Sequence, residues 1–289
     1  MAVKFFGQFL IEQGVITRID LLRAIDLQEK TNLRFGDLVI SMGLMTREQV
    51  KTVHRAQRHD DLQFGDMAVK MGFMSQDQIA KVLDRQRREH LYIGEALVKL
   101  GALTSEQLAE QLAQFNREQK NYIVEKAAIP AGVPDRPIWE IVADLTYKML
   151  TRIAGIPFRP GPCTTTGQLP KRPIIVEMGF SGAVSARYLL SFSETTHSLV
   201  ANAILRDEGD QQNSLPTPDE SIIEFVNIVC GNAVSQAARL GYSIDITPAS
   251  LHRDNHEQLD VAGSRHCLMF PIYLSDGEVF EISIFIRDN

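Results

Sequence analysis

Asp219-Glu220-Ser221-Ile222-Ile223-Glu224-Phe225-Val226-Asn227-Ile228-Val229-Cys230-Gly231 is the stretch that decides the fold. Its apolar residues recur at steps of three and four, which predicts a helix with one buried face. Pro218 favours a helix start here, and Gly241 favours an end near residue 240. The opposite face carries one stripe of residues at steps of four, three and four: Glu220, Glu224, Asn227 and Gly231.

This stripe differs from an ordinary solvent-exposed helix face, which is usually rich in lysine, arginine and glutamate. It offers two carboxylates, an amide and then no side chain. A glycine inside a helix costs about 1 kcal/mol relative to alanine. A close approach by another molecule would explain that cost. The alternative interpretation is an exposed stripe with a glycine that serves internal packing.

The order of an acidic residue, Glu224, two further residues, Asn227 and then Gly231 resembles the signature helix of the CheC/CheX/FliY family of chemotaxis phosphatases. These proteins hydrolyse the aspartyl phosphate of CheY-type receiver domains. A single helix of this kind makes the CheX-type members the closer likeness, over residues 128 to 289. The family usually has Asp or Ser at the place of Glu220.

The resemblance implies a role for each residue of the stripe. Asn227 would orient the attacking water, Glu224 would contact the receiver's lysine, Glu220 would add charge at the rim, and Gly231 would leave room for the partner. The receiver supplies its own Mg²⁺, so the resemblance implies no metal ligand and no cofactor from this chain. It also implies a homodimer, which an exposed sheet edge could form.

The N-terminal part of the chain is a repeat of four 29-residue units over residues 4 to 119. Glycines mark each unit twice, at Gly7, Gly36, Gly65 and Gly94 and again at Gly14, Gly43, Gly72 and Gly101. The second glycine predicts the end of a short helix, and a capping box after it predicts a second helix. One such hairpin is too small to fold alone, so we expect the four to stack around one shared core.

The second unit, from Arg34 to Gln57, resembles the 24-residue motif of MshEN domains, found at the N-terminus of type II secretion and pilus assembly ATPases. Some of these domains bind cyclic di-GMP across a tandem pair. The resemblance makes the following residues candidates for nucleotide binding: Arg34, Gly36, Val39, Ile40, Gly43, Leu44 and Gln57. The other units depart from the motif at Phe5, Gln63, Tyr92 and Phe115. The alternative for the repeats is docking to a protein.

Residues 129–134, which are rich in proline and glycine, predict an extended connection. We place an MshEN-like repeat domain at residues 1–126 and a CheX-like domain at residues 127–289. The expected class is a two-domain α+β protein, with tandem helical repeats followed by an antiparallel sheet covered by helices. In the second domain we expect helices over 138–153 and 195–205, strands over 174–180, 184–192, 242–246, 268–274 and 279–286, and a loop over 156–172.

The formal net charge of −6 divides into +1 over residues 1–126 and −7 over the rest. This balance argues against a nucleic acid polymer as partner. We expect a cytoplasmic protein, since we find neither a signal peptide nor an apolar run long enough to span a membrane. Cys163, Cys230 and Cys267 are far apart and predict neither a disulfide nor a metal site.

Two classes of function follow. The first is an enzyme, a phosphatase of a CheY-type response regulator, regulated at the repeats by cyclic di-GMP or by protein docking. The alternative is a non-enzymatic signalling adaptor that dimerises through the CheX-like domain and binds cyclic di-GMP or a partner through the repeats. The pair Glu224 and Asn227 favours the enzyme, and the incomplete repeat motifs favour docking.

Overall fold

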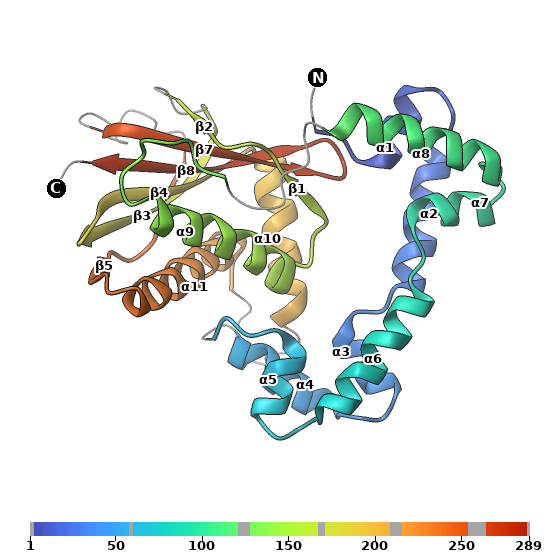
Figure 1. The fold of residues 1–289 in the computed structure, drawn as a ribbon, viewed down its shortest axis with the longest axis horizontal. Coiled ribbons are helices and arrows are strands. Elements are labelled where there is room, and N and C mark those ends of the chain that lie inside the picture. The colour runs from blue at the N-terminus through green and yellow to red at the C-terminus, as the bar shows by residue number, and fades with distance from the viewer. Residues whose placement is uncertain are drawn as a thin grey trace. The chain divides into compact units, whose positions relative to one another are not determined.

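The computed structural model describes residues 3–57, 60–120, 128–166, 171–208, 216–253 and 264–287 (Figure 1). The chain divides into two compact units, Phe5–Lys120 and Asn121–Asn289, and the four N-terminal residues group with the second. The first unit is helical, and the second is built on an antiparallel sheet with helices, so the predicted two-domain α+β class is confirmed. The boundary expected at residue 126 lies outside the described residues and stays a prediction.

Each repeat of the helical unit consists of a short helix followed by a longer one. The short helices are α1 (Phe6–Glu12), α3 (Phe35–Ser41), α5 (Phe64–Lys70) and α7 (Ile93–Lys99), and the longer ones are α2 (Arg18–Thr31), α4 (Arg47–Gln57), α6 (Gln76–Glu89) and α8 (Ser105–Gln119). The second glycine of each repeat has a φ between 66° and 73° and ends the short helix as predicted. The capping boxes also form. In the second repeat the Thr46 N–H donates to Gln49 Oε1 at 2.8 Å, and the Gln49 N–H donates to Thr46 Oγ1 at 3.2 Å.

The four repeats do not share one core, so that prediction is wrong. The first and fourth repeats pack around a core that includes Phe9 and Leu97, and the second and third pack around Leu38 and Met67. The pairing is reciprocal, because the short helix of each repeat lies against the longer helix of its partner: α1 with α8, α7 with α2, α3 with α6 and α5 with α4 (Figure 1). Each pair therefore buries its apolar faces within itself, whereas an open stack would need polar caps at both ends.

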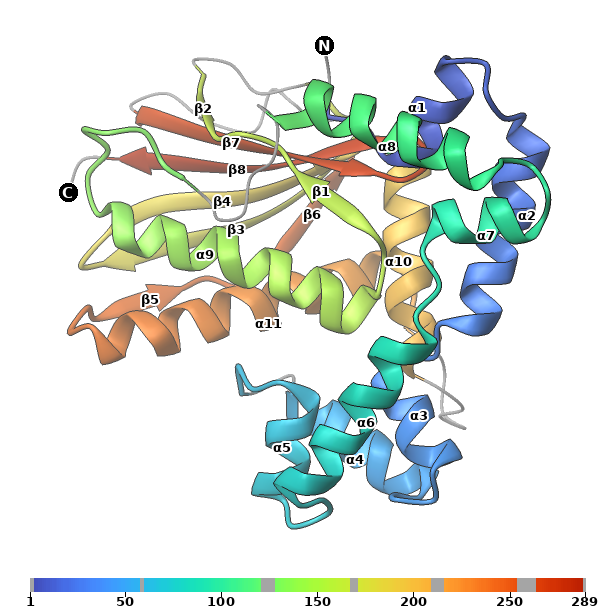
Figure 2. The same ribbon diagram turned by 45° about the vertical axis from the view of Figure 1, so that its right-hand side comes forward.

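The second unit has one antiparallel sheet with helices on one face (Figure 2). The strands run β1-β7-β8-β4-β3-β5 across the sheet, with β2 beside β7 and β6 beside β3. Their bounds are β1 (Phe158–Pro160), β2 (Thr164–Thr165), β3 (Ile174–Gly182), β4 (Ser185–Phe192), β5 (Ile244–Ile246), β6 (Ser250–Arg253), β7 (Ser264–Leu274) and β8 (Val279–Arg287). The helices are α9 (Arg136–Met149), its π-helical extension η2 (Leu150–Ala154), α10 (Glu194–Glu208) and α11 (Pro218–Arg239).

The main core of this unit lies between the sheet and the helices. Val176 and Met178, alternate residues of β3, are buried in it, as expected from the two-residue period of a strand. Phe225 and Val229 of α11 pack into the same cluster. This packing fixes the buried face of α11 and turns the stripe of Glu220, Glu224, Asn227 and Gly231 away from the core.

The predicted helices and strands of the second unit form, with bounds that differ by a few residues. Three strands were missed: β1 and β2, which lie in the expected loop over 156–172, and β6. They are two to four residues long, too short to show a period in the sequence. Within the described part of the chain, the helices are too short or too polar to span a membrane.

Candidate functional site

Glu220 is held at the first turn of α11 by Thr217, the residue that caps the helix. The Thr217 N–H donates to Glu220 Oε2 at 2.7 Å, and the Glu220 N–H donates to Thr217 Oγ1 at 3.3 Å. The hydrogen bonds that Glu220 accepts from the Thr217 backbone N–H and hydroxyl lower the pKa of its carboxyl group. Glu220 is therefore a member of a capping box as well as a predicted rim charge.

The start of α11 is also tied to neighbouring elements by charge. Arg253, at the end of β6, places Nη2 2.7 Å from Asp219 Oδ1 and Nη1 3.0 Å from Glu194 Oε1 at the start of α10. His197 is buried, and burial lowers its pKa; its Nε2 lies 3.1 Å from Asp219 Oδ1, at an angle that is not that of a hydrogen bond. Sequence reasoning missed this cluster because its partners are 34 and 59 residues apart.

Asn227 is half-buried, and its amide has a fixed orientation. Oδ1 accepts a hydrogen bond from the backbone N–H of Ala249 at 3.2 Å. A backbone N–H can pair only with the oxygen side of the amide, so Nδ2 points away from Ala249. Its two N–H groups can then donate to another molecule.

Glu224 and Gly231 lie on either side of Asn227 in the stripe. Glu224 is exposed to solvent. A Cβ atom added to Gly231 would meet no described atom within 4 Å. Among the described residues nothing packs against this position, so internal packing does not explain the cost of Gly231 within the helix.

The described residues of the chain contain no group of three His, Cys, Asp or Glu side chains that could hold a metal ion. Cys163 is half-buried, and burial raises the pKa of its thiol to about 12. Since the thiolate is the nucleophilic form of cysteine, Cys163 is not activated for nucleophilic attack at neutral pH. The polar side chains of the stripe itself are the amide of Asn227 and the carboxylates of Glu220 and Glu224.

Several of the candidate nucleotide-binding residues serve the packing of the second and third repeats. Val39 is fully buried, and Ile40 and Leu44 pack at the edge of the same core. Gly36 lies beneath α4, because a Cβ there would be 3.1 Å from Val50 Cγ1. Gly43 has a φ of 66° and ends α3, while Arg34 is exposed at its start. Nucleotide binding by these residues stays a prediction.

Gln57, the last of the candidates, belongs to a set of glutamines that join partner repeats. In three repeats the closing glutamine donates to a backbone carbonyl of the partner: Gln28 to Leu91 at 3.0 Å, Gln57 to Leu62 at 2.8 Å and Gln86 to Leu33 at 3.3 Å. In the fourth repeat Phe115 takes this place, and its ring lies 5.3 Å from that of Phe6 and 5.4 Å from that of Phe9. The last residue of the motif therefore makes a contact between paired repeats. The 29-residue spacing of these residues in the sequence did not reveal this role.

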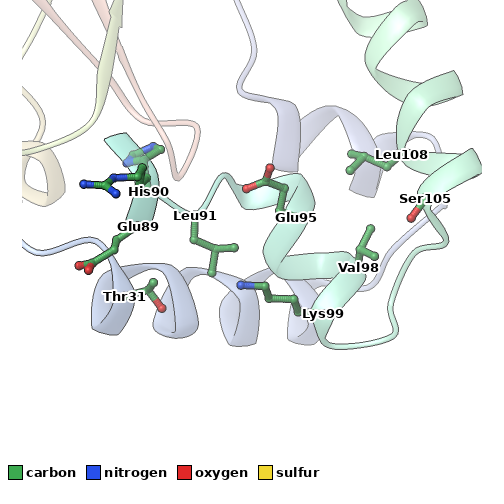
Figure 3. A pocket seen from close by; sticks show the side chains of 10 residues that line it. Thr31, Glu89, His90, Leu91, Glu95, Val98, Lys99, Ser105 and Leu108 are labelled. Carbon is green, nitrogen blue, oxygen red and sulfur yellow. The ribbon is translucent and has the colours of Figure 1, made fainter. Parts of the chain in front are cut away.

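A cavity of about 680 Å³ lies within the helical unit (Figure 3). Its lining includes Leu91 and Leu108 together with charges of both signs, Arg88 and Lys99 beside Glu89 and Glu95. None of the seven nucleotide candidates lines this cavity or the much smaller one beside it. The mixture of charges selects neither an anionic nor a cationic ligand.

Comparison with known proteins bears on the second unit. Residues 174–273 match the model of the family described as chemotaxis phosphatase CheX, so this part of the chain forms a CheX-family domain. The match contains α11 with its whole stripe. The MshEN resemblance of the repeats stays a prediction. No curated protein matches the sequence.

Solved structures with similarity to the chain include a chemotaxis protein CheX from Desulfovibrio desulfuricans. It is 18% identical, with a TM-score of 0.43, and the match covers 52% of this chain and 99% of that one. A CheX–CheY–BeF3–Mg²⁺ complex from Borrelia burgdorferi is 24% identical, with a TM-score of 0.42 and coverage of 52% and 98%. FliY from Thermotoga maritima is 13% identical, with a TM-score of 0.41 and coverage of 55% and 92%.

Proposed function

We propose that this protein hydrolyses the aspartyl phosphate of a CheY-type receiver domain. The observation that carries the proposal is the Asn227 amide, whose orientation is fixed by the hydrogen bond from Ala249. On the same side of α11, Glu224 is exposed, and the space at Gly231 is not filled by any described atom. This arrangement lies within the residues that match the CheX family model. Phosphoryl transfer depends mostly on positioning and on charge stabilisation, so an amide and a carboxylate suffice when the receiver brings its own Mg²⁺.

Each residue of the stripe then has a distinct task. Asn227 Nδ2 donates to the water oxygen and holds that water in line with the phosphorus. Glu224 pairs with the receiver's lysine, which fixes the register of the two proteins more than it adds affinity. Gly231 lets the receiver approach the backbone of α11 closely, and Glu220 adds negative charge at the rim.

The decay of a phosphorylated CheY-type receiver, measured with and without the full chain, tests the proposal. Wild type should accelerate the decay, and Asn227→Ala should remove the acceleration while its thermal unfolding stays the same. Asn116→Ala, the same change at an exposed position of α8, is the matched control and should behave as wild type. Equal acceleration by Asn227→Ala and wild type would contradict the role of the amide.

Glu224→Ala separates binding from chemistry. Since Glu224 contacts the partner away from the attacking water, its loss should raise KM for the phosphorylated receiver and leave kcat nearly unchanged. An unchanged KM would remove Glu224 from the contact surface. No acceleration by wild type would leave the non-enzymatic adaptor as the function.

For the helical unit we propose docking to a protein in preference to binding cyclic di-GMP. The support is that Gln57 and Gly36 are engaged in contacts between and within the repeats. The expected homodimer of the second unit stays a prediction, which sedimentation at several protein concentrations tests.

A further inference from the structure

The segment Thr247-Pro248-Ala249 interrupts the edge of the sheet in the manner of a β-bulge. It joins β5 and β6, which both pair with β3. Phe180 of β3 faces Ile246 of β5, and Glu177 of β3 faces Ser250 of β6. Three residues of the edge therefore face two residues of β3, and one residue is extra. A bulge of this kind redirects the groups of the edge strand, and such bulges are common beside active sites.

The hydroxyl of Thr247 takes part in the pairing where the bulge begins. The Thr247 N–H donates to the Gly179 carbonyl at 3.0 Å, as in a regular ladder. The Gly179 N–H, however, donates to Thr247 Oγ1 at 2.9 Å. In a regular antiparallel pair that N–H would go to the backbone carbonyl of the opposite residue. The Thr247 hydroxyl thus replaces a backbone carbonyl as the acceptor for the Gly179 N–H. Pro248, the next residue, has no N–H that would need a partner.

The next backbone donor is Ala249, and its N–H is the one that Asn227 Oδ1 accepts. Ala249 also packs against the main core of the unit, which limits its movement. We propose that Thr247 is a positioning residue for Asn227. By holding the bulge on Gly179, it aims the Ala249 N–H at the amide and so turns Nδ2 toward the attacking water. The proposal rests on the proposed phosphatase function.

Enzyme kinetics on the full chain test the link to turnover. Thr247→Val keeps the shape of the side chain and removes the hydroxyl, whereas Thr247→Ser keeps the hydroxyl. Because small displacements of a positioned group are costly, Thr247→Val should lower kcat for receiver dephosphorylation by about tenfold or more, with KM unchanged. Thr247→Ser should restore most of kcat. Thr165→Val, the same change on β2, should leave both parameters unchanged. An unaltered kcat in Thr247→Val would overturn the proposal.

A measurement without a receiver tests the geometry by itself. The side-chain amide signals of Asn227 in a nitrogen–proton NMR spectrum are assigned by their absence in Asn227→Ala. Thr247→Val should shift these signals and speed the exchange of the Ala249 amide proton, and Thr247→Ser should not. If neither quantity moves, Thr247 does not position Asn227, whatever the activity.

The kinetic and the NMR measurements distinguish failure of the proposed phosphatase function from failure of the proposed role of Thr247. A wild-type protein that does not accelerate decay refutes the phosphatase and the catalytic part of this proposal, and the NMR result then decides whether Thr247 orients the amide. If Thr247→Val does not fold, Gly179→Ala replaces it, because the added Cβ would lie 3.2 Å from Thr247 Oγ1 and press on the hydroxyl. That variant should lower kcat severalfold, and an unchanged kcat with unmoved Asn227 signals would overturn the proposal.

Discussion

Gly231→Ala should make the protein more stable and a poorer phosphatase. Gly231 lies inside α11, and an added Cβ would touch no described atom within 4 Å. The substitution therefore gains helix propensity, about 1 kcal/mol, without steric strain. For a folding unit of this size, about 1 kcal/mol raises Tm by about 2–4 °C.

The effect on activity should have the opposite sign. If the receiver approaches the backbone at Gly231, the new methyl group enters a packed contact, and overpacking costs roughly 1–3 kcal/mol. A loss of about 1.4 kcal/mol corresponds to a tenfold weaker complex. We expect KM for the phosphorylated receiver to rise about tenfold, while kcat changes little because Asn227 is untouched.

Scanning calorimetry of the full chain and receiver decay kinetics measure the two effects. Gly7→Ala provides the contrast, because a Cβ there would lie 2.5 Å from Leu21 Cδ1 and should lower the stability of the helical unit. A lower Tm in Gly231→Ala would mean that the glycine serves internal packing after all. A higher Tm with an unchanged KM would show that the partner does not approach α11 at this position.

Three further predictions concern the cap, the repeats and the nucleotide. The hydrogen bonds from Thr217 hold the pKa of Glu220 in the folded protein below its ordinary value of 4.5. The stabilisation of the folded state by these bonds is therefore present above pH 4.5 and is lost as the pH falls through the folded-state pKa. Glu220→Gln should flatten the fall of Tm with acidity, and parallel curves for variant and wild type would contradict this. Gln57→Ala leaves the Leu62 carbonyl without its donor and should cost about 1–3 kcal/mol of stability, with an unchanged Tm as the contrary result. Calorimetric titration tests cyclic di-GMP: Arg34→Ala should weaken any binding, and no heat with wild type would remove the ligand.

Local signals in the sequence were sufficient for α11. The apolar period gave its buried face, and Pro218 and Gly241 gave its ends, because each of these signals acts within a turn or two of helix. One local signal was overlooked. Thr217 and Glu220 stand three residues apart just before an apolar run, which is the spacing of a capping box. This spacing would have predicted the hydrogen bonds between Glu220 and Thr217.

The contacts that fix Asn227 could not be read from the sequence. The bond to Ala249 joins residues 22 positions apart, and the bulge that aims it depends on a one-residue change of register against β3. Periodicity describes one element at a time and carries no information on register between strands. The same limit hid the Arg253 cluster.

The repeats show a related limit. A 29-residue period defines the unit but does not say which units pair, and we expected all four to share one core. A clue was present, because the fourth repeat has Phe115 where the others have glutamine, and the first repeat has Phe6 and Phe9. These rings meet in the structure, and they distinguish the outer pair from the inner one.

The surroundings of Asn227 and Glu224 restrict the substrate that this stripe can serve. Sites for small molecules are usually concave and enclose most of the ligand surface. Glu224 is exposed on the side of a helix, and Asn227 is half-buried beside Ala249. A free phosphate ester would thus meet one half-buried amide and a carboxylate in open solvent, where charge effects are weak. A receiver domain, in contrast, would exclude water from the stripe and bring the phosphate with its metal ion. On the proposed function, the stripe of α11 would therefore form one half of a site that the partner completes.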